Sequence, residues 1–363
     1  MVPTEEPSGF AGFLQAYQAL LPAPLLVLIL YVVYRFFRST WRELDLDAQE
    51  SRAAILAEGK SDLRPFVALC LAAFILTVQY SYGDSVYFRS TVYPWLSRLD
   101  ARHPGMKLVA YADLYNLAWW GFSRVFGYTL PFMVWRLFFP KDSLLDLGLR
   151  ARGFFAHAWI YMLFFAVVVP AMLVVANNPD FGSYYPFYKD ASRSWFDFLV
   201  WEVIYFAQFF ALEMFFRGFF LGALRKSFGS GAIFVMAVPY CMIHYGKPYL
   251  EACGAIIAGV ALGSLSMKTR SIYQGFLVHV TVAGMMDWLA LRNRKATPLA
   301  FWRETRLEMP TDGDPALREA LAIKVEIVAA VFFVALFGLL AVNLWRDWKR
   351  RRGQCAPLPE PSL

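Results

Sequence analysis

The apolar stretch Trp195–Leu224 decides the fold of this chain, and it reads WFDFLVWEVIYFAQFFALEMFFRGFFLGAL. It is long enough to cross a bilayer, because a membrane-spanning helix needs about 20 predominantly apolar residues. It also carries an acid, Glu213, and a base, Arg217. A charge such as arginine at the centre of a membrane helix costs roughly 2.5–3.5 kcal/mol, so these groups persist where they face one another or a hydrated cavity. The stretch therefore predicts a membrane helix that contributes to a polar site.

The same apolar character extends along the whole chain. Its 363 residues are 58% hydrophobic and 17% charged, whereas soluble domains carry about 25% charged residues. The apolar segments predict an all-α, polytopic transmembrane helix bundle of about nine spans. The predicted spans are Leu20–Phe37, Pro65–Tyr82, Leu108–Phe139, Phe154–Ala176, Trp195–Leu224, Gly231–Tyr245, Leu250–Met267, Ile272–Leu291 and Ile323–Trp345.

The net charge of +7 is local, because a basic cluster, Arg346–Arg352, follows the last apolar segment. Such a cluster is typical of a cytoplasmic end under the positive-inside rule, and it can bind anionic lipid headgroups. No basic soluble domain is present to hold a nucleic acid. We therefore expect an integral membrane protein of a bacterial inner membrane, with membrane lipids and no nucleic acid among its partners.

Two of the four histidines fall in apolar segments that come after Glu213 and Arg217 in the chain. These are His244, one turn after Tyr240, and His279. Taken singly, each histidine is most often a packing residue, and Glu213 with Arg217 can be an ion pair that only fixes helix packing. Together, however, Glu213, His244 and His279 on successive membrane helices predict an active site, because ionisable groups inside a membrane are functional by default.

The chemistry of this set fits amide hydrolysis without a covalent intermediate. A glutamate and a histidine can hold a water molecule and remove its proton, while a second histidine stabilises the oxyanion that forms. Two histidines and a carboxylate can also bind a divalent metal such as zinc. The His-Glu-x-x-His spacing of many zinc proteases is absent, so the residues favour the metal-free interpretation and require no cofactor.

These motifs resemble those of the CAAX-processing and bacteriocin-processing (CPBP) family of intramembrane proteases, which includes the type II CAAX prenyl endopeptidases. The family carries Glu-Glu-x-x-x-Arg, then Phe-x-x-x-His, then His-x-x-x-Asn on successive helices. The resemblance covers residues 147–291 and implies catalytic roles for Glu213, His244 and His279. It divides the chain into N-terminal helices with a cytoplasmic segment (1–146), a protease core (147–291), and a loop, last span and basic tail (292–363).

The chain departs from the family pattern at three positions. Leu212 stands where the first glutamate is expected, Tyr240 replaces the phenylalanine, and Ala283 replaces the asparagine. The first change moves the role of general base to Glu213, and the third removes an oxyanion donor. Other polar groups of the same segments can support the site, and these are Arg217, Tyr240, Gln208, Asp287 and Glu202.

Two functions from different classes follow. The first is an intramembrane endopeptidase that acts on a peptide or protein, prenylated or secreted, near the membrane face. The second is a catalytically inactive relative that serves as a membrane scaffold or an immunity-type binding protein, and Leu212 and Ala283 motivate it. A transporter needs paired broken helices or inverted repeats, and the sequence shows neither.

Overall fold

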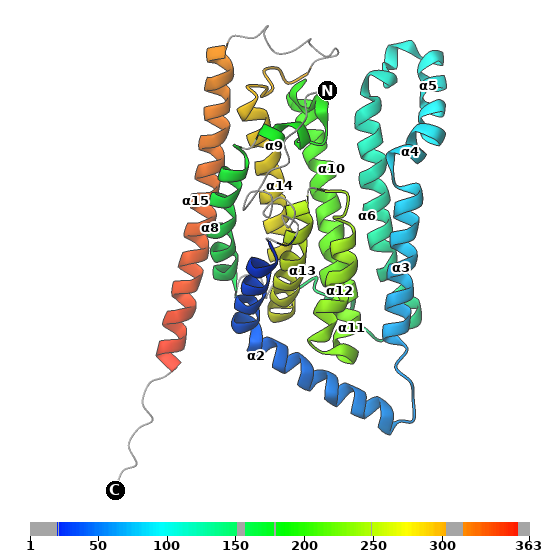
Figure 1. The fold of residues 1–363 in the computed structure, drawn as a ribbon, viewed down its shortest axis with the longest axis vertical. Helices are drawn as coiled ribbons and strands as arrows, with labels where there is room; N and C mark the ends of the chain where they lie inside the picture. The colour runs from blue at the N-terminus through cyan, green and yellow to red at the C-terminus, as the bar shows by residue number, and fades with distance from the viewer. Residues whose placement is uncertain are drawn as a thin grey trace, which may run out of the picture. The chain divides into compact units, whose positions relative to one another are not determined.

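The computed structural model describes residues 20, 22–150, 157–177, 179–247, 249–302 and 315–354, and within them the predicted all-α class is confirmed (Figure 1). The longer helices are α2 Pro22–Ala57, α3 Arg64–Tyr82, α5 Tyr93–Arg102, α6 Ala112–Phe138, α8 Ala158–Val175, α10 Trp195–Glu213, α12 Gly231–Met242, α13 Tyr249–Thr269, α14 Tyr273–Asn293 and α15 Pro315–Gln354. The shorter ones are α4 Ser85–Tyr87, α9 Pro179–Tyr184, α11 Leu221–Phe228, four 3₁₀ turns (104–106, 108–111, 144–146 and 189–192) and the π-helices Phe88–Val92 (η1) and Met214–Phe220 (η6).

Six helices in the described part of the chain are long and apolar enough to cross a membrane. They are Pro22–Ala57, Arg64–Tyr82, Trp195–Phe228, Glu251–Thr269, Tyr273–Asn293 and Pro315–Leu339. The other three predicted spans correspond to α6, α8 and α12. With 12 residues, α12 rises about 18 Å, which is less than the 30 Å hydrocarbon core. Six of the described helices are thus candidate spans by length and composition, and nine crossings stay a prediction.

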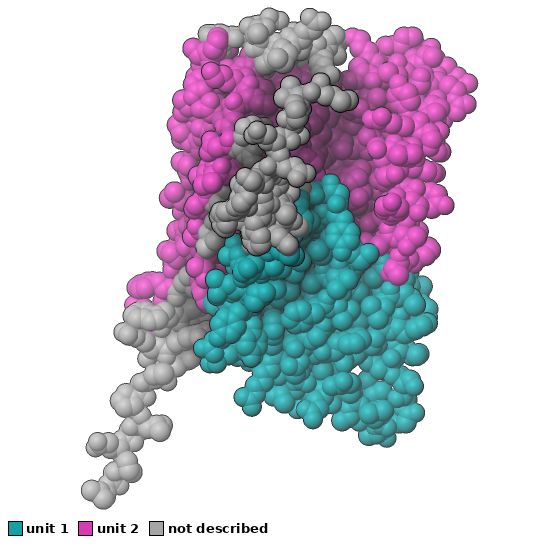
Figure 2. Space-filling view, viewed as in Figure 1, with its two compact units in different colours: residues 1–72, 131–149, 214–272 teal, residues 73–130, 150–213, 273–363 magenta. Residues whose placement is uncertain are grey.

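The described helices divide into two compact units that alternate along the chain (Figure 2). Unit 1 comprises residues 1–72, 131–149 and 214–272, and unit 2 comprises residues 73–130, 150–213 and 273–363. The boundary between residues 213 and 214 falls inside the acid–base motif, so Glu213 belongs to unit 2 and Arg217 belongs to unit 1.

In unit 1, small residues let helices approach closely. On α13, Gly259 and Gly263 are four residues apart, and a Cβ at Gly259 would lie 3.2 Å from Ala237 Cβ on α12. Such small-residue pairs are typical of membrane helix interfaces. The N-terminal helix α2 joins this unit through its Trp41 indole, which donates to Ser264 Oγ on α13 at 2.9 Å. Unit 1 is therefore held by residues that are far apart in sequence.

Gly218 lets a neighbouring segment approach the chain closely. A Cβ on Gly218, in η6, would lie only 2.6 Å from the carbonyl oxygen of Leu147. The neighbouring Gly148 has φ +88° and accepts a hydrogen bond from the Ile272 backbone at 3.0 Å. A residue with a side chain rarely adopts that φ. The segment around residue 148 thus packs backbone against backbone on the π-helix.

In unit 2, α10 begins at a buried ionic network. The Ser194 hydroxyl accepts from the Asp197 backbone at 3.1 Å, which is an N-cap bond. Arg193 pairs with the Asp197 carboxylate, and the side chains of both are almost fully buried, at 3% and 0% exposed. The Tyr188 phenol donates to Asp197 Oδ1 at 2.7 Å. Burial and the Asp197 carboxylate raise the pKa of Tyr188, so its hydroxyl stays a donor. Asp197 therefore fixes the start of α10.

Replacing Tyr188 by phenylalanine is expected to lower the free energy of unfolding by about 1.5–3 kcal/mol, because it removes a buried hydrogen bond to a charged acceptor. The melting temperature of the purified protein measures this. Tyr80→Phe is the matched control, since Tyr80 is 85% exposed. Equal melting temperatures for Tyr188→Phe and Tyr80→Phe would contradict the role given to this network.

Candidate functional site

The helix that carries Glu213 and Arg217 is not a regular α-helix. From Met214 to Phe220 it forms a π-helix, η6, between α10 and α11. A π-turn closes with i→i+5 hydrogen bonds, is rare, and is frequent at functional sites. The membrane helix predicted over Trp195–Leu224 therefore departs from α-helical geometry between Glu213 and Arg217. Their pairing stays a prediction.

Unit 2 brings Glu213 and His279 together. Glu213, at the last position of α10, is 0% exposed, and its Oε1 lies 3.0 Å from Nδ1 of His279 on α14. The His279 side chain is 16% exposed. Its ring stacks on Phe209 with centroids 5.0 Å apart and planes 12° from parallel. The imidazole thus lies beside a carboxylate at one nitrogen and against an aromatic face.

The Glu213 carboxylate occupies space that only a glycine leaves open. A Cβ on Gly275, one turn before His279, would lie 2.8 Å from the carboxyl carbon of Glu213. Real Cβ contacts are essentially never that short. Gly275 therefore lets α14 approach the end of α10, which is a requirement that the sequence reasoning missed. The signal that could have found it is the spacing Gly-x-x-x-His in residues 275–279.

Unit 1 holds the third residue of the predicted catalytic set. His244 lies in the turn that follows α12, not within a membrane helix as predicted, because α12 ends at Met242. His244 Nδ1 lies 2.8 Å from the Tyr240 carbonyl oxygen. Because a carbonyl only accepts, this contact places the proton on Nδ1 and leaves Nε2 as an acceptor. The guanidinium of Arg217 lies over the Tyr240 ring, 3.9 Å from its centroid.

Two acidic side chains, Glu202 on α10 and Asp287 on α14, are buried in unit 2. Asp287 is fully buried and accepts from the Trp201 indole at 2.6 Å. Glu202 is 6% exposed, and neither of its carboxyl oxygens has a hydrogen-bond partner among the described residues. The amide nitrogen of Gln208 is likewise buried without a partner in this part of the chain. The sequence singled out these three residues, and the structure places all of them in the interior.

Replacing Glu202 by methionine is expected to raise the free energy of unfolding by about 1–3 kcal/mol. The change removes a buried group without a hydrogen-bond partner and keeps a side chain of similar shape. Asp287→Leu is the contrasting variant, since it leaves the Trp201 indole without its acceptor and should lower stability. Chemical denaturation of the two variants checks the signs. A destabilised Glu202→Met variant would show that Glu202 has a partner that its surroundings conceal.

The family's asparagine position is apolar in this structure. Ala283 is 5% exposed and belongs to a cluster of buried residues that includes Trp201 and Tyr205. An asparagine there would need a hydrogen-bond partner among aromatic rings. This surrounding explains why alanine is tolerated, and it gives no donor to replace the missing amide at that position.

A zinc ion requires three or four protein donors. Among the described residues, no group of three His, Cys, Asp or Glu side chains is arranged to hold a metal ion. The described residues therefore do not fit a zinc site in this arrangement.

Residues 194–285 match the family described as Type II CAAX prenyl endopeptidase Rce1-like. This segment is therefore similar to the Rce1-like family. The resemblance predicted from the motifs is thus confirmed, and the Rce1-like segment lies within the predicted core, residues 147–291. Neither the search of curated proteins nor the search of solved structures gave a match.

Proposed function

We propose that the protein is an intramembrane endopeptidase that hydrolyses a peptide bond with water activated by the Glu213–His279 pair. The observation that supports this most is the 3.0 Å contact between Glu213 Oε1 and His279 Nδ1 inside the Rce1-like segment. The family name points to a prenylated peptide with a C-terminal CAAX sequence as the substrate class.

Burial supports the roles that we give the two groups. The carboxylate is 0% exposed, whereas the imidazole is 16% exposed, so His279 is the more accessible of the two. A proton on Nδ1 faces the carboxylate, which leaves Nε2 to accept a proton from water. Glu213 then orients the ring and stabilises the imidazolium, as the aspartate does in a catalytic triad. This differs from the role of general base that the resemblance implied for Glu213.

The imidazolium then gives its proton to the leaving amine as the C–N bond breaks, and the oxyanion needs a hydrogen-bond donor. The buried amide of Gln208, in unit 2, is the donor we assign to the substrate carbonyl, and a role of His244 in the same site stays a prediction. Arg217, Tyr240 and Asp287 are positioning residues in this proposal. Arg217 and Tyr240 stack on one another in unit 1, and Asp287 fixes Trp201 in unit 2.

The test is cleavage of a fluorogenic peptide that ends in a prenylated CAAX sequence, with the full-length protein in proteoliposomes. We expect the unmodified protein to cleave the peptide and His279→Gln to lose at least 100-fold in rate. His103→Gln is the matched control, because His103 is exposed at the end of α5.

The second candidate, an inactive membrane scaffold, is favoured by the buried Leu212 and Ala283 at two motif positions. A well-folded protein that leaves the peptide intact at every substrate concentration would support the scaffold and overturn the protease. Equal rates for the unmodified protein and His279→Gln would also overturn the mechanism.

A further inference from the structure

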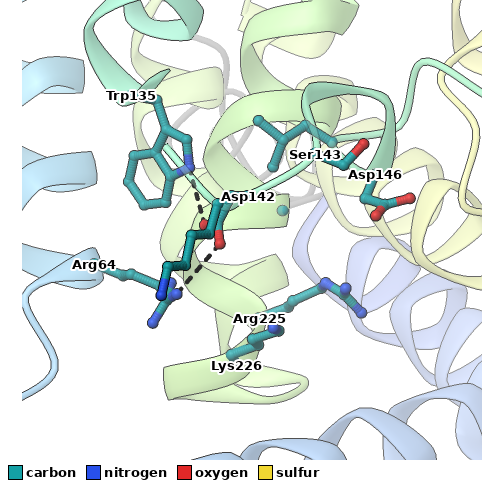
Figure 3. A pocket seen from close by; sticks show the side chains of 10 residues that line it. Arg64, Trp135, Asp142, Ser143, Asp146, Arg225 and Lys226 are labelled. Carbon is teal, nitrogen blue, oxygen red and sulfur yellow. Dashed lines mark hydrogen bonds and ion pairs between the residues drawn. The ribbon is translucent and has the colours of Figure 1, made fainter. Parts of the chain in front are cut away.

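Unit 1 contains a cavity of about 220 Å³ that the proposed protease chemistry does not use (Figure 3). Its polar lining is mostly basic, and the charged residues are Arg64, Lys141, Arg225, Lys226, Asp142 and Asp146. Four basic and two acidic groups leave an excess of two positive charges. Pockets for drug-sized ligands measure about 300–1,000 Å³, so this cavity fits a small anionic group.

The cavity is formed by the ends of membrane-spanning elements. Arg64 begins the candidate span Arg64–Tyr82, and Arg225 and Lys226 lie in the last turn of the span that ends at Phe228. The Asp62 carboxylate joins these ends, because it accepts from the Arg64 backbone at 3.1 Å and from the Ser227 hydroxyl. Residues at the ends of spans lie at the depth of the lipid headgroups.

One of the two carboxylates is already occupied by protein donors. Asp142 Oδ1 lies 3.3 Å from the Arg64 guanidinium, and Asp142 Oδ2 accepts from the buried Trp135 indole at 3.3 Å. Figure 3 marks both contacts with dashed lines. Arg64 also lies over the Phe139 ring, 5.2 Å from its centroid. Asp142 therefore balances Arg64 and holds it at the wall of the cavity.

The other basic side chains have no such partner. The side chains of Lys141, Arg225 and Lys226 make no hydrogen bond or ion pair with any described residue; Arg225 is half-buried and the two lysines are exposed. Burying a guanidinium that has no carboxylate partner costs free energy, and a bound anion offsets that cost. Arginine binds phosphate through two parallel N–H donors, and lysine adds a compact charge.

We propose that this cavity binds a phosphate group, with Arg225 as the main donor and Lys226 and Lys141 as flanking charges. The group comes from an anionic phospholipid headgroup or from a free phosphate ion, and both sources present the same oxygens to the same donors. The inference concerns unit 1 alone and does not depend on peptide cleavage.

The experiment measures the melting temperature of the full-length protein in a neutral detergent. The added probes are phosphatidylglycerol, the zwitterionic phosphatidylcholine, and inorganic phosphate with chloride at equal ionic strength as its reference. A saturating specific ligand should raise the melting temperature by about 5 °C. We expect phosphatidylglycerol to raise the melting temperature more than phosphatidylcholine does. A rise with inorganic phosphate and no lipid would identify the free ion as a ligand.

Variants decide whether the cavity is the site. Arg225→Gln combined with Lys226→Gln should lose more than half of the shift, and the milder Lys141→Gln should lose part of it. Lys268→Gln is the matched control, because Lys268 lies at the end of a candidate span and does not line the cavity. It should keep the full shift.

Two outcomes would overturn the proposal. One is a double variant that folds and keeps the whole shift. The other is an unmodified protein that responds equally to the two lipids and not at all to inorganic phosphate. If the double variant does not fold, Lys141→Gln and native mass spectrometry of retained phosphatidylglycerol decide, and unchanged retention in Lys141→Gln would count against the site.

Discussion

Replacing Glu213 by glutamine is expected to slow peptide cleavage by about 10²- to 10⁴-fold, the usual contribution of a group in acid–base catalysis. Glutamine keeps the size of the side chain but offers His279 an uncharged amide in place of a carboxylate. The imidazolium that forms when His279 takes a proton from water then loses its stabilising charge. Initial rates in proteoliposomes measure the loss, and a retained melting temperature shows that the variant is folded.

The pair should act as one unit, so the double variant separates this role from a structural one. If Glu213 works through His279, then Glu213→Gln with His279→Gln should be about as slow as either single variant. Independent roles would instead multiply the two losses. Glu58→Gln serves as the control carboxylate, because Glu58 pairs with Lys60 on the surface and its side chain is 63% exposed. A Glu213→Gln variant with the rate of Glu58→Gln would remove Glu213 from the mechanism.

Replacing Gly275 by alanine is expected to lower the cleavage rate by at least about 100-fold, although the added group is a single methyl. Its Cβ would need the place of the Glu213 carboxylate, whose Cδ lies 2.8 Å away. The carboxylate is the far end of a flexible side chain, so it can move, and the loss of stability should be small. The contact with His279 is what the movement breaks.

The matched control is Gly284→Ala on the same helix. A Cβ there would lie 3.3 Å from the ring of Phe206, so the neighbour has to yield by only a few tenths of an ångström. Activity should remain within about threefold of the unmodified protein, because the Glu213–His279 contact is untouched. The comparison fails if the two alanine variants lose activity to the same extent.

Sequence periodicity and composition predicted the all-α membrane fold and the helices that carry the site. The prediction worked because charge in an apolar segment is rare enough to mark Glu213, and because Glu213 and His279 lie on elements with clear apolar boundaries. The Rce1-like match over residues 194–285 agrees with the resemblance seen in the same motifs. The convergence of Glu213, His244 and His279 on one pocket stays a prediction.

Other features have no local sequence signal. The π-helix at Met214–Phe220 inserts one residue into a turn, and nothing in the apolar pattern distinguishes it from an α-helix. Helix α12 ends before His244, and residues 243–246 form a turn. Because this turn includes Ile243 and Tyr245, the apolar pattern does not mark where the helix ends. The partners of Gly275 and Ala283 come from α10, more than 60 residues earlier, so a single-segment reading does not reveal them.

The interleaving of the two units has a consequence for how the chain is made. Trp41 on α2 finds its hydrogen-bond partner, Ser264, only after 223 further residues. At about 5–20 residues per second, a ribosome needs roughly 10–45 s to deliver that partner. During this interval α2 is in the bilayer before α13, which carries Ser264, has been made. A membrane-insertion factor that binds helices without a partner would therefore have to bind α2 for most of the time in which this protein is made.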